Sequence, residues 1–497
     1  FCSTTSAWKE LTKHSYWHRP GHEPLLPLTT GQLVEHAAKK WGDREALVSV
    51  HQNQRLSFKQ VCEKADKLAA GLVQLGMQHG DRVGIWGPNS TEWYLTQMAA
   101  ARAGLMLVNI NPAYQIPELN YCLNKVGVKA LIASEKFKSQ NYHQMVEAIA
   151  PEINTCQPGK LKSKNLPELK SLIFISEKYL KGSFRFDDIL SSANEEGLQK
   201  IHEMQDNIQS DEGCNIQFTS GTTGKPKATV LTHHGTVNNA FIVGRGLGFS
   251  LEPEESLNTI DKEKCTFLYG TPTMYVDLLN AVDRVGASLT SLQVALSTGA
   301  HCSQYLFQQM LKKLQLKRVS SVYGLTETSP VIFQTHVDDT EEQATTTLGH
   351  SLDHLEVKVV DSEGRLVPFG TPGELCVRGF GVMLGYWGDE AKTKEVLGED
   401  RWFKTGDQFI LQEDGRGRVI FGIEDERMGE EICAAIRTRE GIDVTQSDIS
   451  AFCKGKISHF KVPRHVLAVS DFPKTTSGKI QKFKLKEMLE QKLGANK

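Results

Sequence analysis

Short apolar segments alternate with amphipathic helices along the first third of the chain, and this alternation restricts the possible folds more than any other feature. One helix is predicted to begin after Ser57, whose hydroxyl can cap it, because apolar residues recur at spacings of four and three as far as Leu75. The elements predicted after it are strands at residues 83–86, 105–108 and 130–133, and helices at residues 92–103 and 117–126. Short buried strands joined by helices indicate βαβ units and a mostly parallel sheet.

The same alternation returns in the second half of the chain. Its predicted strands are residues 215–218, 228–231, 266–269, 294–297 and 319–323. Residues 355–378 are rich in strand-forming segments, and residues 480–493 carry a helical apolar stripe. We therefore predict an α/β fold with a large N-terminal domain of mostly parallel sheets flanked by helices, a β-rich subdomain, and a small α+β C-terminal lid domain. A chain of 497 residues corresponds to about three domain-sized units, which suits this arrangement.

The composition excludes several classes of protein. The chain has 57 Lys and Arg residues against 59 Asp and Glu residues, and this balance argues against a broadly basic surface for nucleic acid or membranes. Its ten cysteines include no Cys-x-x-Cys pair and no zinc-type cluster, which favours free thiols in a reducing compartment. The most apolar helical stretch, residues 94–108, contains Arg102 and is too short for a transmembrane segment.

The most informative segment is the loop at residues 219–227. Its two glycines allow a tight turn that exposes backbone N–H groups, and its hydroxyls and lysines supply further donors, so it suits polyphosphate. The donors and glycines in it are Thr219, Ser220, Gly221, Thr222, Thr223, Gly224, Lys225 and Lys227. The loop is not a Walker A loop, because Thr219 stands where that motif has glycine and Pro226 follows the lysine. A solvent-exposed polar turn is the plain alternative.

Residues 219–227 resemble the signature loop of the adenylate-forming superfamily, which comprises acyl-CoA synthetases, adenylation domains and firefly luciferase. Four further blocks follow in the order of that superfamily: residues 323–328 (Tyr-Gly-Leu-Thr-Glu-Thr), 373–375 with 385–387 (Gly-Glu-Leu and Gly-Tyr-Trp), 402–407 (ending Thr-Gly-Asp), and 473–479 (ending Ser-Gly-Lys). Within the superfamily, the blocks at residues 383–387, 427–431 and 452–461 are similar to mitochondrial acyl-CoA synthetases that act on medium-chain fatty acids.

The resemblance implies a reaction in two steps. The carboxylate of a fatty acid attacks the α-phosphate of ATP, which gives acyl-AMP and pyrophosphate, and the thiol of coenzyme A then displaces AMP. The implied small molecules are therefore a fatty acid, ATP, Mg²⁺ and coenzyme A, and no nucleic acid is implied. Electrostatic stabilisation and positioning should dominate the first step, because negative charge develops on phosphate oxygens while a carboxylate approaches.

The resemblance also implies which residues bind the nucleotide. The 219–227 loop would hold the β- and γ-phosphates, and Tyr323, followed by Gly324, would stack on adenine. Gly299 and Ala300 would line the adenine edge, although by themselves they indicate any tight turn. Asp407 would accept both ribose hydroxyls, since a carboxylate has two oxygens, and its plain alternative is a helix or turn cap.

Three residues are implied in catalysis. Thr326 would contact the α-phosphate, and Glu327, a hard oxygen ligand, would help to bind Mg²⁺ beside the phosphates. Lys479, on a Ser-Gly hinge, would bring its ammonium group to the α-phosphate and the acyl oxygen together. The plain alternatives are a solvated surface carboxylate for Glu327 and one more lysine of a basic tail for Lys479.

The chain departs from the superfamily pattern in two places. Near residue 250 it lacks strands and a loop that shape the acyl pocket of the family, and near residue 422 it lacks the hinge and a glycine-rich turn. We accordingly place the AMP-binding domain at residues 1–421 and a lid domain, truncated at its hinge, at residues 422–497. Loss of central strands would expose apolar edges and remove core area, so an impaired product is one expectation.

Three functions stay open on this basis. The first is a fatty acid–CoA ligase of the AMP-forming type, acting on medium chains. The second is a non-catalytic or impaired nucleotide- or acyl-binding relative, which the absent segments favour. The third, weaker alternative is another adenylating enzyme, either an adenylation domain or a luciferase-like oxygenase. A mitochondrial matrix location is implied by the resemblance alone.

Overall fold

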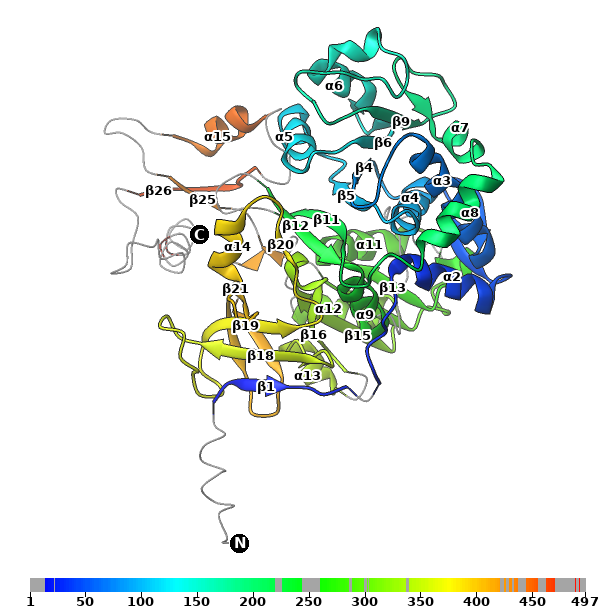
Figure 1. Ribbon diagram of the computed structural model, residues 1–497. Coiled ribbons are helices and arrows are strands. Elements are labelled where there is room, and N and C mark those ends of the chain that lie inside the picture. The colour runs from blue at the N-terminus through cyan, green and yellow to red at the C-terminus, as the bar shows by residue number, and fades with distance from the viewer. Residues whose placement is uncertain are drawn as a thin grey trace.

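Three sheets make up most of the molecule in the computed structural model (Figure 1). The structure describes residues 14–219, 226–243 and 260–420, apart from residues 22, 286–287, 299–301, 303 and 337–338, and beyond residue 420 it describes residues 424–425, 429–430, 433–436, 444–454, 462–469, 488 and 491. The predicted tail helix at residues 480–493 therefore lies almost wholly outside the described residues, as do the two places near residues 250 and 422.

The first sheet is mostly parallel, as predicted. Its strand order is β10-β9-β6-β4-β5-β11-β12-β20, and the strands from β10 to β11 run parallel while β12 and β20 are antiparallel additions. In chain order its strands are Arg82–Trp86 (β4), Met106–Ile110 (β5), Ala130–Ser134 (β6), Ser171–Ile175 (β9), Phe184–Arg185 (β10), Gly213–Thr219 (β11), Lys227–Thr232 (β12) and Gly385–Tyr386 (β20).

Helices cover both faces of this sheet. Side chains that alternate along each strand are therefore buried on both faces. The helices α3, α4, α7 and α8 cover one face, where Val83 and Ile85 point, and α5 and α6 cover the other, where Trp86 lies (Figure 1). The elements of this region are Thr30–Trp41 (α2), Phe58–Gln74 (α3), Thr91–Arg102 (α4), Ile116–Val126 (α5), Tyr142–Ile149 (α6), Phe186–Ser191 (α7) and Glu195–Met204 (α8), a short 3₁₀ turn at Pro151–Asn154 (η1), and the hairpins Glu45–Ser49 (β2) with Gln54–Ser57 (β3) and Lys136–Phe137 (β7) with Gln140–Asn141 (β8).

The predicted capping of the first long helix is confirmed. The Ser57 hydroxyl accepts from the backbone N–H of Gln60, and the Gln60 side chain accepts from the backbone N–H of Ser57. This reciprocal pair satisfies two N–H groups that would otherwise lack partners at the start of α3.

The second sheet combines parallel and antiparallel pairing. Its order is β13-β14-β15-β16-β17, in which the first three strands run parallel and the last two are antiparallel. Helices α11 and α12 pack on one face, against Leu268, Ala295 and Val319. The elements here are His233–Val243 (α9), Phe267–Gly270 (β13), Pro272–Val285 (α11), Val294–Ser297 (β14), Gln304–Lys313 (α12), Arg318–Gly324 (β15), Thr326–Thr328 (η2), Val331–Gln334 (β16), Glu341–Thr346 (α13) and His350–Ser351 (β17).

The third sheet is antiparallel throughout and confirms the predicted β-rich stretch. Its order is β1-β18-β19-β21-β22, so a strand from the beginning of the described chain forms one edge (Figure 1). Its elements are Tyr16–His18 (β1), Leu355–Val360 (β18), Gly373–Gly379 (β19), Glu390–Val396 (α14), Phe403–Leu411 (β21) and Gly417–Ile420 (β22). The short described elements beyond it are Glu424–Asp425 (β23), Gly429–Glu430 (β24), Cys433–Ile436 (β25), Gln446–Cys453 (α15) and His465–Ala468 (β26).

A buried ion cluster joins three helices beside the first sheet. Arg102, whose side chain is 1% exposed, donates through Nε to Asp66 Oδ1 over 2.6 Å and through Nη1 to Glu35 Oε2 over 2.7 Å. These carboxylates belong to α3 and α2, so the arginine at the end of α4 ties the three helices together.

Within the described part of the chain, no helix is long and apolar enough to cross a membrane.

Arg102→Met should lower the midpoint of thermal unfolding by several degrees, because it removes the guanidinium that pairs with the buried Asp66 carboxylate and leaves it the contacts to His202 and to the Cys62 thiol. Circular dichroism during heating measures the effect. Arg55→Met is the matched control, because the Arg55 side chain pairs with Glu45 and Glu263 at the exposed surface. Equal midpoints for the Arg102 variant and the wild type would contradict this account.

Candidate active site

The two ends of the predicted phosphate loop lie side by side on neighbouring strands. Thr219 ends β11 and Lys227 begins β12, and the two residues are direct partners in this antiparallel pair. Residues 220–225, which include the predicted Ser220, Gly221, Thr222, Thr223, Gly224 and Lys225, lie outside the described residues. The hairpin thus positions the first and last members of the loop at one edge of the sheet.

A buried carboxylate lies beside this hairpin. Glu327, in the short helix η2, is 6% exposed, and its Oε1 accepts from the Tyr386 hydroxyl over 2.9 Å and from Thr219 Oγ1 over 3.5 Å. The Tyr386 hydroxyl in turn accepts from the Lys227 ammonium over 3.0 Å. Three strands of the first sheet, β11, β12 and β20, and the turn after β15 therefore bring four polar side chains together.

In this cluster the Tyr386 hydroxyl bonds both to the positive charge of Lys227 and to the negative charge of Glu327. The Lys227 ammonium also lies 4.6 Å from the centre of the Tyr386 ring, a cation–π geometry. Burial and the nearby Glu327 carboxylate raise the pKa of Tyr386 well above its ordinary value. The phenol therefore stays protonated and can donate to Glu327 at any physiological pH.

A second polar pair links the second and third sheets. The Tyr323 hydroxyl, at the end of β15, donates to Asp407 Oδ2 on β21 over 2.6 Å. The Tyr323 ring is 9% exposed and packs against Phe333 and Phe409, with its centre 5.7 Å from that of Phe409. Burial and the Asp407 carboxylate raise the pKa of Tyr323 well above its ordinary value, so the hydroxyl remains a donor.

Gly324 allows the chain to turn sharply after β15. A Cβ atom at this position would overlap the carbonyl oxygen of Pro330 and lie 2.8 Å from its carbonyl carbon. Thr326 then opens η2 and is half-buried, while the Thr328 hydroxyl donates to the carbonyl of Leu325 over 2.9 Å and so fixes the turn. The chain therefore packs closely against itself at the start of the turn that carries Thr326 and Glu327.

The structure brings most of the described candidates into two hydrogen-bonded groups. The first group is Thr219, Lys227 and Glu327, and the second is Tyr323 and Asp407. Gly299, Ala300 and Lys479 lie outside the described residues. Sequence reasoning missed Tyr386 as a site residue, although its place in the Gly-Tyr-Trp block was a usable signal.

Among the described groups of this hydrogen-bonded cluster, the Glu327 carboxylate is the one that suits a hard cation such as Mg²⁺. No set of three or more His, Cys, Asp or Glu side chains is arranged to hold a metal ion anywhere in the described ranges. Mg²⁺ bound with phosphates needs only one or two protein carboxylates, because phosphate and water oxygens complete its shell. Hydroxyl donors hold Oε1 of Glu327, and its hydrogen bonds to described residues all go to that oxygen. The donor set therefore fits Mg²⁺ accompanied by polyphosphate.

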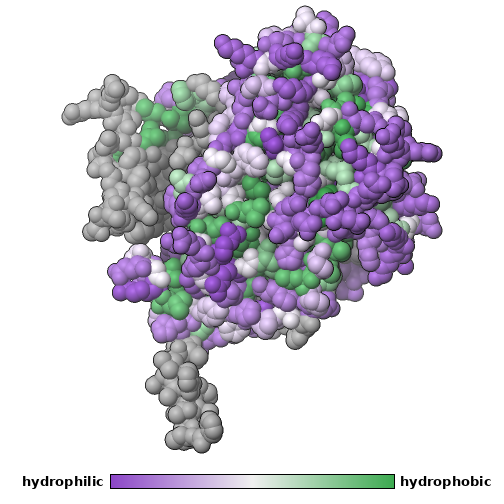
Figure 2. Space-filling model, viewed as in Figure 1, coloured by the Kyte–Doolittle hydropathy of each residue, from purple (hydrophilic) through white to green (hydrophobic). Residues whose placement is uncertain are grey.

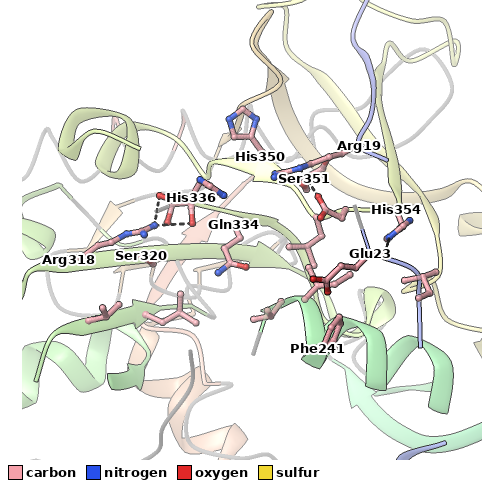
Figure 3. A pocket seen from close by; sticks show the side chains of 18 of the residues that line it. Arg19, Glu23, Phe241, Arg318, Ser320, Gln334, His336, His350, Ser351 and His354 are labelled. Atoms are coloured by element: carbon pink, nitrogen blue, oxygen red, sulfur yellow. Dashed lines mark hydrogen bonds and ion pairs between the residues drawn. The ribbon is translucent and has the colours of Figure 1, made fainter. Parts of the chain in front are cut away.

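A separate cavity of about 490 Å³ lies at the other end of the second sheet (Figure 3). Its walls include the first residues of three parallel strands, Phe267, Val294 and Arg318, whose neighbours along each strand face α11 and α12. Phe241, from the end of α9, and Gln334, from β16, line it as well (Figure 3). Parallel strands are normally covered on both faces, and among the described residues this face of the three strands borders the cavity.

Comparison with known protein families shows to which family this chain belongs. The sequence model of the AMP-binding enzymes matches residues 34–248 and 245–387, and that of the AMP-binding enzyme C-terminal domain matches residues 418–479. The chain belongs to the family of AMP-binding enzymes. The first match is split in two pieces at residues 245–248, beside the position where the sequence predicts an absent segment.

Similar proteins share most of their length with this AMP-binding enzyme. The mitochondrial medium-chain acyl-CoA ligase ACSF2 of Bos taurus is 39% identical, with 94% of this chain and 88% of the relative covered. That alignment runs over 542 positions, more than the 497 residues of this chain, so the relative has residues that this chain lacks. A putative acyl-CoA synthetase of Bacillus subtilis, YngI, is 32% identical, with 93% and 97% covered.

Solved structures confirm the fold of this AMP-binding enzyme. The long-chain-fatty-acid-CoA ligase FadD1 from Archaeoglobus fulgidus superposes with a TM-score of 0.70 at 19% identity, covering 91% of this chain and 99% of that one. The anthranilate CoA ligase AuaEII superposes with a TM-score of 0.68 at 21% identity, covering 94% and 98%. The predicted α/β class with parallel sheets and a β-rich part is therefore correct.

Gly324→Ala should destabilise the protein and lower its unfolding midpoint by several degrees, because the added methyl group would overlap backbone atoms of Pro330. Differential scanning fluorimetry provides the measurement. Gly270→Ala serves as control, since the atoms nearest to its added Cβ belong to the Tyr275 side chain and lie 3.3 Å or more away. A Gly324 variant as stable as the Gly270 variant would show that the turn can relax.

Proposed function

We propose that this enzyme activates a medium-chain fatty acid with ATP to form acyl-AMP and then acyl-CoA, releasing pyrophosphate and AMP. The observation that carries the proposal is the 39% identity, over 94% of the chain, to a medium-chain acyl-CoA ligase. The Glu327 cluster and the Tyr323–Asp407 pair support it, because they supply the carboxylates and cation that an ATP site needs.

The described residues divide the work of binding ATP. Lys227 and the Thr219 hydroxyl, at the two ends of the 219–227 loop, would contact the β- and γ-phosphates, where charge-assisted donors are strongest. Asp407 would accept the ribose hydroxyls, and its bond from Tyr323 fixes the carboxylate in place. Tyr323 would stack on adenine, with Gly299 and Ala300 along the adenine edge.

The adenylation step depends on charge placed before the substrates arrive. Thr326 would contact the α-phosphate, and Glu327 would hold Mg²⁺ beside the polyphosphate. Mg²⁺, when bound, neutralises charge on the phosphate oxygens and orients them. Burial of Glu327 and Tyr386 excludes water from the hydroxyl donors around the carboxylate, which strengthens these interactions.

The division of the chain follows from the same roles. We assign residues 1–421 to the AMP-binding domain and residues 422–497 to the lid, which would carry Lys479 to the α-phosphate. Coenzyme A would enter between them for the second step. A mitochondrial matrix location accords with the mitochondrial relatives.

A second candidate is an impaired relative that binds nucleotide or acyl groups without completing the reaction. The length of the bovine alignment and the split family match at residues 245–248 favour it, because the sequence predicts absent segments beside the acyl pocket and at the hinge. In this case the Glu327 cluster would still bind nucleotide, but coenzyme A would receive no acyl group.

Pyrophosphate release measured across a fatty-acid series, with and without coenzyme A, separates these functions. The ligase should release pyrophosphate with ATP and a medium-chain acid and should form the thioester when coenzyme A is added. ATP binding without pyrophosphate release from any acid would favour the impaired relative. Adenylation that never yields a thioester would contradict the ligase as stated.

Lys479→Ala should reduce adenylation by about a hundredfold or more, because it removes a charge placed at the reacting phosphate. Thioester formation from preformed acyl-AMP and coenzyme A should change little, and comparing the two half-reactions tests this. Lys482→Ala is the matched control, as a neighbouring lysine of the same tail. An equal loss in both half-reactions would rule out a role confined to adenylation.

A further inference from the structure

Tyr386 occupies the space between the end of the phosphate loop and the buried carboxylate. Its side chain is 5% exposed, and its hydroxyl lies 3.0 Å from the Lys227 ammonium and 2.9 Å from Glu327 Oε1. An ammonium group can only donate and an ionised carboxylate can only accept, so the direction of both bonds is set. The phenol accepts from Lys227 and donates its single proton to Glu327.

The backbone around Tyr386 holds the same neighbours. The N–H of Met383 donates to the backbone carbonyl of Glu327 over 2.9 Å, and the N–H of Leu384 donates to Val230 on β12 over 3.0 Å. Tyr386 itself lies opposite Thr229 in the pairing of β20 with β12. One short segment, residues 383–386, therefore joins the helix η2 to the strand that begins with Lys227.

These contacts distinguish the ring of Tyr386 from its hydroxyl. The ring packs in the apolar core with Leu231 and Met383, so it contributes to stability. The hydroxyl instead bonds to two charged groups, Lys227 and Glu327, at the proposed nucleotide site. Its pKa is raised by burial and by Glu327, so the bond to the carboxylate does not depend on pH in the physiological range.

We propose that Tyr386 is a positioning residue, whose hydroxyl sets the carboxylate of Glu327 and the ammonium of Lys227 at fixed places for the polyphosphate of ATP and its accompanying cation. The inference rests on the proposed function, because it assigns these two groups to nucleotide binding. By occupying Oε1, the phenol directs Glu327 to meet a cation through its other oxygen. It also separates Lys227 from Glu327, so the two charges do not neutralise each other directly.

The test is Tyr386→Phe, which removes one oxygen atom and keeps the ring. Isothermal titration calorimetry gives the Kd for ATP in excess Mg²⁺ and, separately, in EDTA. The Kd in EDTA divided by the Kd with Mg²⁺ reports how strongly the cation assists ATP binding, and its measurement needs no turnover. We expect the variant to weaken binding with Mg²⁺ by roughly tenfold and binding in EDTA much less, so that the ratio falls.

Tyr142→Phe is the matched control, because its buried hydroxyl donates to the carbonyl of Pro112 over 2.6 Å, away from the site. Both variants should unfold near the same temperature, and Tyr142→Phe should keep the wild-type ratio. A Tyr386 variant with the wild-type ratio would overturn the proposal. So would an unfolding midpoint far below that of Tyr142→Phe, which would make the hydroxyl a structural group.

A double variant tests the route through Glu327. Glu327→Gln should lower the same ratio, and adding Tyr386→Phe should lower it little further, since the two residues act as one unit. If the double variant lowered the Kd ratio by the product of the two single-variant effects, the proposal would be overturned. Failure of the wild type to release pyrophosphate would contradict the proposed ligase function but leave the ratio measurable, so the two failures are distinguishable.

Discussion

Parallel strands need apolar cover on both faces, and the architecture of this enzyme follows from that requirement. In the first sheet, helices from both sides meet the alternating side chains of β4, β5 and β6, and the buried Arg102 cluster ties three of those helices together. In the second sheet, α11 and α12 cover one face fully, while a cavity lies against the other. Val243, the last described residue of α9, lines this cavity, and the family match is split a few residues further along the sequence.

The candidate site lies where the three sheets meet, and each contributes a different kind of group. The first sheet supplies a cation and hydroxyls, the turn between β15 and β16 of the second sheet supplies one carboxylate, and the third sheet supplies another. Figure 2 shows that much of the face in this view is hydrophilic, with apolar residues gathered near its middle, around the position of β20 in Figure 1. Leu384, next to β20, is 46% exposed and adds to the apolar surface beside the site.

Local patterns in the sequence were enough to predict much of this fold. Ser57 predicted where α3 begins, and short apolar runs predicted β4, β5 and β6 to within about two residues. The signature blocks likewise indicated Glu327 and Asp407, although their roles remain predictions. The Gly-Tyr-Trp block marked Tyr386, but its hydrogen bonds to Lys227 and Glu327 could not be predicted, because they depend on the pairing of β20 with β12 across more than one hundred and fifty residues of chain. Long-range pairings leave no periodic trace in a single sequence.

The edge strand β1 has a consequence for how the chain is made. Its hydrogen-bonded partner is β18, and the Tyr16 hydroxyl reaches Glu356, 340 residues further along. During synthesis this first segment leaves the ribosome long before its partner strand exists, and it must wait while the first and second sheets assemble behind it. Of the three large sheets the antiparallel one is thus completed last, and a nascent chain stopped before β18 would carry an unpaired strand that can associate with other chains.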